Sequence, residues 1–280
     1  MTPVANCWNL EPRATVRFQR GGSPAFPELL DTHSVERGAP RQVPSRFREK
    51  RGVVAELKGA VIEFPANGRK VRGYLSKPES GAGPGVLVIQ EWWGLVENIK
   101  NIADRFAASG YVALAPDLYH GEATKSPDEA GKLMMALKIE ETEKDLRGAS
   151  TYLLSQSSGK KLGIVGFCMG GQLALFAASK NEAIGACVDF YGIHPNVKPD
   201  YARIEAPVLG LFAEKDAYVS PEVVKKLEAD LKKAGVETDF TIYPGCDHGF
   251  FNDTRKEVHD VAAAADAWRR VQACFAKYLK

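Results

Sequence analysis

Strand-like apolar runs alternate with amphipathic segments along most of the chain. These runs are short and are bounded by glycine, proline or charged residues; they cover residues 60–64, 71–75, 85–89, 111–115, 162–165, 184–188, 206–213 and 240–243. In the segment 98–108, Ile99, Ile102 and Phe106 would share one face of a helix. About eight strands with helices between them predict an α/β fold, with a mostly parallel sheet and helices on both of its faces.

Local signals mark where some of these elements begin. Asn67-Gly68 favours a turn between the first two strands, but the stretch between the two apolar runs is longer than two residues, so the turn type stays open. Ser126, Pro127 and Glu129 predict a helix start with a capping box. Further helices are expected over residues 140–155, from residue 220, and over residues 258–278.

The first 55 residues differ from the rest of the chain. Prolines and glycines recur there without sustained periodicity, and residues 1–50 hold eight Lys/Arg against five Asp/Glu. We therefore expect a disordered or loosely packed extension over residues 1–55, followed by one folded domain over residues 56–280. The extension lacks the apolar core of a secretory signal. Its arginines suit an organellar transit peptide, but its acidic residues weaken that interpretation.

Composition argues against several classes of protein. A formal net charge of +2 in 280 residues does not favour nucleic-acid binding, and no apolar run is long enough to span a bilayer. Five cysteines are scattered without a C-x-x-C pair, which indicates a reducing compartment rather than a disulfide framework. The sequence therefore predicts a cytoplasmic monomer or small homo-oligomer with neither nucleic acid nor membrane as a partner. An organellar location is the alternative.

A glycine-flanked cysteine stands at one strand-to-helix transition. Gly166-Phe167-Cys168-Met169-Gly170 follows the apolar run 162–165 and precedes the helix-like run 172–178. This context matches the nucleophile elbow G-x-S-x-G of α/β-hydrolases with cysteine in place of serine. The elbow would hold the sulfur at a helix N-terminus, where the positive end of the dipole suits a thiolate. A buried cysteine in a glycine-rich turn is the alternative.

The chain offers an acid and a histidine to accompany this thiol. A thiol nucleophile needs a base, and in an α/β-hydrolase the acid and then the histidine follow the nucleophile, on loops after later strands. Asp216 stands just past one apolar run, and His248 lies in the loop after the next. Glu214 and Asp247 compete for the role of the acid. The other histidines are disfavoured by chain order or by a helical context; they are His33, His120, His194 and His259.

Two backbone N–H groups are expected to stabilise the oxyanion of such a reaction. One belongs to Met169, directly after the nucleophile, and the other to Trp92, in the loop after the third strand. Trp93, next in the same loop, and Tyr119 would bound the substrate pocket. Simple packing of the adjacent tryptophans is the alternative.

Four motifs in this order resemble the dienelactone hydrolase family, a branch of the α/β-hydrolases with cysteine as nucleophile. They lie within residues 61–280 and are Gln90-Glu91-Trp92-Trp93-Gly94, Ala115-Pro116-Asp117-Leu118-Tyr119, Gly166-Phe167-Cys168-Met169-Gly170-Gly171 and Asp247-His248-Gly249-Phe250. The resemblance implies hydrolysis of an ester or lactone through a thioester intermediate. It also implies that Glu91 contacts the resting thiol until substrate binding frees the thiolate.

The chain departs from the best-known members of that family at two positions. Those enzymes clamp the substrate carboxylate with arginines, and this chain has Gly121 and Asn252 at the corresponding places. A neutral ester, a lactone or a larger substrate is therefore at least as consistent with the sequence as dienelactone.

Together these features predict a single-domain thiol hydrolase in which Cys168, Asp216 and His248 act on a small-molecule ester or lactone. No cofactor is expected, and a metal site at Cys246 is disfavoured because no second group of ligands accompanies it. Two alternatives remain: a non-hydrolytic thiol protein with a redox or binding role, and a hydrolase of a thioester, amide or glycosidic bond. A glycosidase would need two carboxylates on opposite sides of a pocket, and Glu91 could be one of them. Glycoside hydrolysis of this kind would not use the cysteine of the elbow.

Overall fold

Within residues 58–279, the part of the chain that the computed structural model describes, eight strands form one sheet. The strands are β1 (Ala60–Ala66), β2 (Arg69–Ser76), β3 (Pro84–Ile89), β4 (Val112–Pro116), β5 (Ser158–Phe167), β6 (Ile184–Phe190), β7 (Val208–Ala213) and β8 (Thr238–Tyr243). The helices are α1 (Glu97–Ala108), α2 (Pro127–Ala136), α3 (Ile139–Gln156), α4 (Met169–Ala178), the 3-10 helix η1 (Tyr201–Arg203), α5 (Pro221–Lys233) and α6 (Val261–Tyr278). The expected extension over residues 1–55 and its boundary lie outside the described residues.

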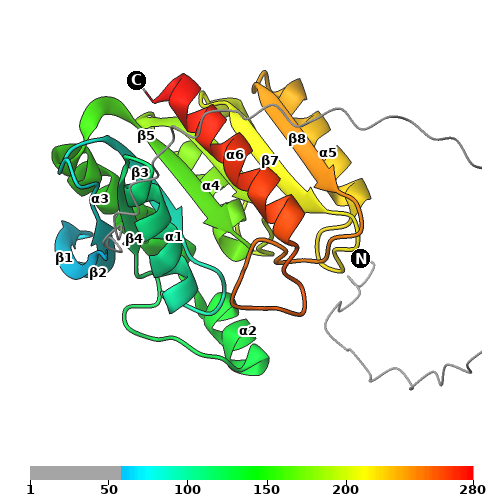
Figure 1. Ribbon diagram of the computed structural model, residues 1–280, viewed down its shortest axis with the longest axis horizontal. Coiled ribbons are helices and arrows are strands. Elements are labelled where there is room, and N and C mark those ends of the chain that lie inside the picture. The colour runs from blue at the N-terminus through cyan, green and yellow to red at the C-terminus, as the bar shows by residue number, and fades with distance from the viewer. Residues whose placement is uncertain (1–57, 280) are drawn as a thin grey trace, which may run out of the picture. The chain divides into compact units, whose positions relative to one another are not determined.

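The strands lie in the order β1-β2-β4-β3-β5-β6-β7-β8 across the sheet (Figure 1). Antiparallel pairing joins β1 to β2 and β2 to β4, whereas the pairs from β4 through β3 and β5 to β8 are all parallel. Parallel neighbours require crossover connections, and the helices supply them. The predicted α/β-hydrolase fold with a mostly parallel sheet is confirmed.

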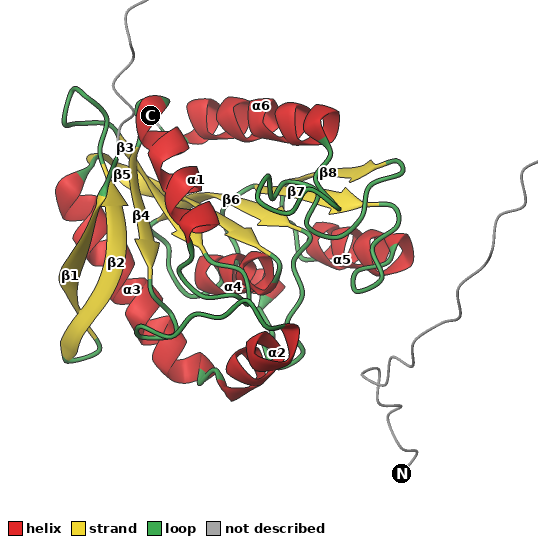
Figure 2. Cartoon of the chain, turned by 60° about the horizontal axis from the view of Figure 1, so that its bottom comes forward, coloured by secondary structure: helices red, strands yellow, loops and turns green. Residues whose placement is uncertain are grey.

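Helices cover both faces of this sheet. Figure 2 shows α1 and α6 on one face and α3, α4 and α5 on the other. Side chains of β3 alternate between the two cores, because Val86 and Val88 pack in one apolar cluster while Leu87 and Ile89 pack in the second. Burial on both faces explains why the parallel strands form continuous apolar runs in the sequence. No helix among residues 58–279 has the length and apolar character needed to cross a bilayer.

The turn between β1 and β2 is shorter than the sequence suggested. It consists of Asn67 and Gly68 alone, between the paired residues Ala66 and Arg69. Their φ angles of 51° and 71° are left-handed, as a two-residue type I′ hairpin turn requires. The expected strands were too short because the ladder of backbone hydrogen bonds continues past the last apolar positions into polar ones.

Two predicted helix starts also differ in the structure. Ser126 precedes α2, but its side chain makes no capping hydrogen bond and its own N–H donates to Thr124 Oγ1 at 3.0 Å, so the capping box does not form. The last helix begins at Val261, later than expected. The Asp260 carboxylate accepts a hydrogen bond from the Ala263 N–H at 2.8 Å and caps the helix there.

The parallel strands bring distant parts of the chain to one edge of the sheet. β3, β5, β7 and β8 are followed by residues 90–94, Cys168, residues 214–219 and residues 244–250. Because the carboxyl ends of parallel strands lie at the same edge, the side chains of these four segments gather there.

Candidate active site

Cys168 occupies a strained turn between β5 and α4. Its φ of 54° is in the left-handed region, which a residue with a side chain adopts rarely and usually at a functional position. The flanking glycines make the turn possible. A Cβ on Gly166 would overlap the Gly170 carbonyl group, and one on Gly170 would overlap backbone oxygens of Ile89 and Gln90 at the end of β3.

Backbone hydrogen bonds fix this turn against the end of β6. The Cys168 N–H donates to the Phe190 carbonyl at 3.0 Å, and the Cys168 carbonyl accepts from the N–H groups of Gly171 and Ile193 at 3.0 and 3.2 Å. The cysteine is 8% exposed. Because the cysteine precedes the first turn of α4, its sulfur faces the partial positive charge of that helix end.

Asp216 and His248 form a hydrogen-bonded pair from the loops after β7 and β8. His248 Nδ1 lies 2.7 Å from Asp216 Oδ2. The other carboxylate oxygen of Asp216 accepts from the N–H groups of Tyr218 and Val219 at 2.8 and 2.9 Å. The carboxylate is buried, and three donors hold it in place.

The imidazole of His248 lies between that carboxylate and the thiol. Burial lowers the pKa of His248, but the charge of Cys168 and the hydrogen bonds to Asp216 and Cys168 outweigh it and raise the pKa to about 10. The structure thus brings Cys168, Asp216 and His248 together. It also encloses the imidazole between two aromatic rings, with centroid distances of 4.9 Å to Tyr191 and 5.1 Å to Tyr218.

Glu91 lies in the loop after β3 and is also buried. Burial raises the pKa of Glu91, while the positive charge of His248, a hydrogen bond from Asn252 and the charge of Arg255 lower it. The Asn252 side-chain amide donates to Glu91 Oε2 at 2.8 Å. The amide oxygen of Asn252 accepts from both the N–H and the hydroxyl of Thr254, at 3.1 and 2.6 Å, so the orientation of the amide is fixed.

The two amides expected to bind an oxyanion belong to the first residue of α4 and to the loop after β3. The loop that carries Trp92 is held in place, because the Gly94 N–H donates to the Glu91 carbonyl at 3.3 Å and the Thr124 N–H donates to the Trp93 carbonyl at 3.1 Å. Met169 directly follows Cys168, and the backbone of Ile89 and Gln90, where the loop that carries Trp92 begins, lies against Gly170 of the elbow.

The two residues expected to bound a substrate pocket border different hollows. Trp93 packs edge-on against Trp92 at 5.0 Å and lines a hollow of about 600 Å³ that Asn252, Arg255 and Lys125 also border. Tyr119 is buried, its hydroxyl donates to Met169 Sδ at 3.1 Å, and it borders a separate hollow of about 370 Å³.

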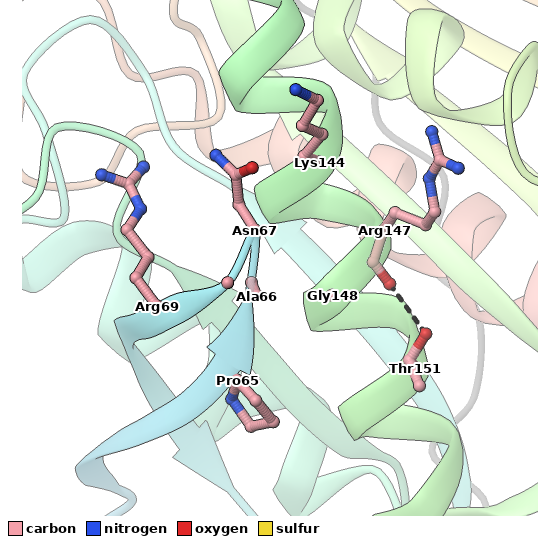
Figure 3. A pocket seen from close by; sticks show the side chains of 9 residues that line it. Pro65, Ala66, Asn67, Arg69, Lys144, Arg147, Gly148 and Thr151 are labelled. Carbon is pink, nitrogen blue, oxygen red and sulfur yellow. Dashed lines mark hydrogen bonds between the residues drawn. The ribbon is translucent and has the colours of Figure 1, made fainter.

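A further hollow, of about 610 Å³, lies between the β1–β2 turn and α3 (Figure 3). The side chains of Arg69, Lys144 and Arg147 border it, and Arg69 pairs with the buried Asp145 at 2.8 Å. None of its lining residues belongs to the segments that gather around the thiol, so this hollow has no part in the site.

Sequence reasoning missed the contributions of Asn252 and Tyr191. Asn252 appeared only as the position of an absent arginine, whereas here it holds Glu91. Tyr191 has a left-handed φ of 42°, is fully buried, and its hydroxyl has no hydrogen-bond partner among the described residues. No local pattern marks either one, because both roles depend on contacts between distant segments.

Comparisons with known proteins agree on one family. Residues 71–279 match the model described as "Dienelactone hydrolase family". "Protein usf" of Aquifex pyrophilus is 41% identical over 79% of this chain and 99% of that protein, and the protein called "Putative carboxymethylenebutenolidase" in Aquifex aeolicus is 38% identical over 79% of this chain and 100% of its own length. The crystal structure of a "Putative Dienelactone Hydrolase" from Klebsiella pneumoniae subsp. pneumoniae is similar, with a TM-score of 0.73 and 28% identity over 79% of this chain and 99% of that one.

Proposed function

This chain belongs to the dienelactone hydrolase family, and we propose that it hydrolyses carboxylic esters or lactones with Cys168 as the nucleophile. One observation carries the proposal: the His248 imidazole is hydrogen-bonded to a buried Asp216 and interacts with the thiol of Cys168 at a strained strand-to-helix turn. A nucleophile, a base and a group that orients the base are the parts that acyl transfer requires.

The first half of the reaction forms a thioester. His248 takes the thiol proton. The charges of the resulting thiolate and of Asp216 raise the pKa of His248 and so stabilise the imidazolium that forms. Cys168 attacks the acyl carbon, and the N–H groups of Trp92 and Met169 stabilise the oxygen anion of the tetrahedral intermediate. When the intermediate collapses, the carbon–oxygen bond breaks and His248 Nε2 returns the proton to the leaving alcohol or enol oxygen.

The second half releases the acid. His248 removes a proton from water, and the resulting hydroxide attacks the thioester carbon. The carbon–sulfur bond then breaks, the carboxylic acid leaves, and the thiol is restored. Asp216 keeps Nδ1 protonated throughout, so that Nε2 always faces the sulfur and the substrate. In a lactone the leaving oxygen stays attached to the acyl chain.

Glu91 modulates the thiol in this proposal. Its carboxyl group is buried, its pKa is raised by that burial, and it lies within the field of His248. Because the raised pKa lets this carboxyl group keep its proton to higher pH than an exposed glutamate does, we propose that it shares the proton with the sulfur before substrate arrives. Such sharing lowers the reactivity of the resting thiol towards oxidants and alkylating agents.

We propose a neutral ester or lactone as the substrate class, because the two positions that carry arginines in the best-known family members hold Gly121 and Asn252 here. Gly121 offers no side chain to a substrate, and the amide of Asn252 is already engaged on both sides, by Glu91 and by Thr254. Neither position therefore supplies a cation for a substrate carboxylate.

Mass spectrometry during turnover tests the proposal. With a panel of lactones and aryl acetates, the wild-type protein should give a burst of product and a transient mass increase of one acyl group. Both should vanish in Cys168→Ala and persist in Cys274→Ala, whose cysteine lies on α6 outside the site. Full hydrolytic activity in Cys168→Ala would refute the mechanism. Sulfenic acid or mixed disulfides at Cys168 without turnover would favour a redox protein instead.

A further inference from the structure

The two rings that flank the His248 imidazole differ in their exposure. Tyr191 is fully buried, whereas Tyr218 is 42% exposed. Among residues 58–279, five large apolar side chains are exposed, and Tyr218 is the only aromatic one of the five. The exposed ring therefore reaches the surface while it is in edge contact with the base.

The backbone of Tyr218 is tied to the same carboxylate as the imidazole. Its N–H donates to Asp216 Oδ1 at 2.8 Å, while His248 Nδ1 bonds Asp216 Oδ2 at 2.7 Å. One carboxylate thus sets the positions of both rings. The exposed part of the Tyr218 ring is not buried against any other part of the described chain. It is therefore available for contact with another molecule.

The chemistry of the reaction determines what that molecule is. The leaving oxygen must reach His248 Nε2 to take up its proton, because Nδ1 is bonded to Asp216. The alcohol portion of the ester must then extend from the imidazole edge towards solvent. Of the two aromatic rings that contact the imidazole, only Tyr218 has exposed surface to offer the alcohol portion.

We infer that Tyr218 determines specificity by binding the alcohol portion of the substrate, and that it favours esters of aromatic or flat enol alcohols over those of small alkyl alcohols. This inference rests on the proposed ester hydrolysis. A planar apolar group can stack on or pack edgewise against the tyrosine ring, whereas a small alkyl group covers little of it.

Two acetates with leaving alcohols of similar acidity test the inference. Phenyl acetate supplies the aromatic alcohol and the acetate of a fluorinated alkyl alcohol supplies the other, so that chemical reactivity does not decide the result. In Tyr218→Ala, kcat/KM for phenyl acetate should fall about fivefold, as expected for the loss of one aromatic contact, and kcat/KM for the alkyl ester should change by less than about twofold. Tyr218→Phe should behave as the wild type does. Val223→Ala removes another exposed apolar side chain, one outside the site, and serves as the control.

Binding of phenol without turnover separates this inference from the proposed function. Phenol should bind Cys168→Ala protein, with NMR shifts at His248, and about fivefold more weakly when Tyr218→Ala is added. Equal phenol affinity in the two proteins, or an equal loss of activity on both esters, would overturn the inference, because Tyr218 would then only position His248. Absence of Cys168-dependent turnover in the wild type would instead remove the proposed function.

Discussion

Asp216 and Glu91 are both buried carboxyl groups within reach of His248, but their surroundings differ. Asp216 receives three hydrogen bonds, from His248 and from two backbone N–H groups of its own loop. Glu91 receives one from a side chain, that of Asn252, and its burial raises its pKa. The number of donors around a buried carboxyl group decides whether it is held as an ion or can exchange a proton.

This difference fits the two tasks that we propose for these acids. A carboxylate whose position is fixed by three donors can orient an imidazole through every step. A buried carboxyl group with fewer hydrogen-bond donors has a pKa that depends more strongly on the charges of neighbouring groups. Four experiments test this contrast, and the largest effect is expected at Asp216.

Asp216→Asn should lower kcat/KM about 1000-fold or more, because the amide lets His248 adopt the wrong tautomer or turn away from the thiol. Steady-state hydrolysis of an aryl ester measures the loss. Asp247→Asn is the matched control, since Asp247 is exposed and was the rival acid in the sequence. A variant with nearly wild-type rates would mean that another acid orients the base.

Glu91→Gln should lower kcat/KM by only about tenfold, because Glu91 adjusts the thiol rather than orienting the base. The same substitution should speed the alkylation of the resting Cys168 by iodoacetamide, since an amide can neither repel the thiolate nor return a proton to it. Glu63→Gln, at an exposed glutamate on β1, should change neither rate. Slower alkylation in Glu91→Gln would contradict a restraining role for Glu91.

Asn252→Ala should have a smaller effect, about threefold on kcat/KM, and should act through Glu91. Loss of the amide removes a hydrogen bond that favours the charged carboxylate, so the pKa of Glu91 should rise further. The pH dependence of iodoacetamide alkylation should shift upwards accordingly. Thr254→Val, which removes only a hydrogen bond to the Asn252 amide oxygen, should shift it less. An unchanged pH profile in Asn252→Ala would show that the hydrogen bond has no influence on Glu91.

The smallest expected effect concerns stability. Because burial raises the pKa of Glu91 in the folded protein, the folded state holds that proton to higher pH than the unfolded chain does, and this group makes stability fall as pH rises above about 4.5. Glu91→Gln should therefore raise Tm more at pH 8 than at pH 5. Asp216→Asn should lower Tm at both pH values. Calorimetry at pH 5 and pH 8 measures these Tm values. If Glu91→Gln had a lower Tm than the wild type at pH 8, burial of Glu91 would not destabilise the folded protein.

The sequence was sufficient to predict the fold and the residues that the structure gathers around the thiol. Apolar runs buried on both faces of the sheet are strong local signals, and the chain order of Cys168, Asp216 and His248 follows from the fold. The catalytic roles of these three residues remain predictions until the variants are measured.

Other parts of the site had no signal in the sequence. The hydrogen bond from Asn252 to Glu91 joins the loops after β8 and β3, and the left-handed backbone of Tyr191 is set by packing at the end of β6. Both depend on how distant segments meet. The Asn67-Gly68 turn was recognisable, but its length was not, because polar residues continue the strands.

The crowding around the elbow glycines limits how this enzyme can be diversified. Gly166, Gly170 and Gly171 each lie against backbone or a buried carboxylate, with no room for even a methyl group. A randomised library that covers these three codons should return glycine whatever ester is used for selection. New substrate ranges will have to come from the loops after β7 and β8, where side chains can change without displacing the sulfur.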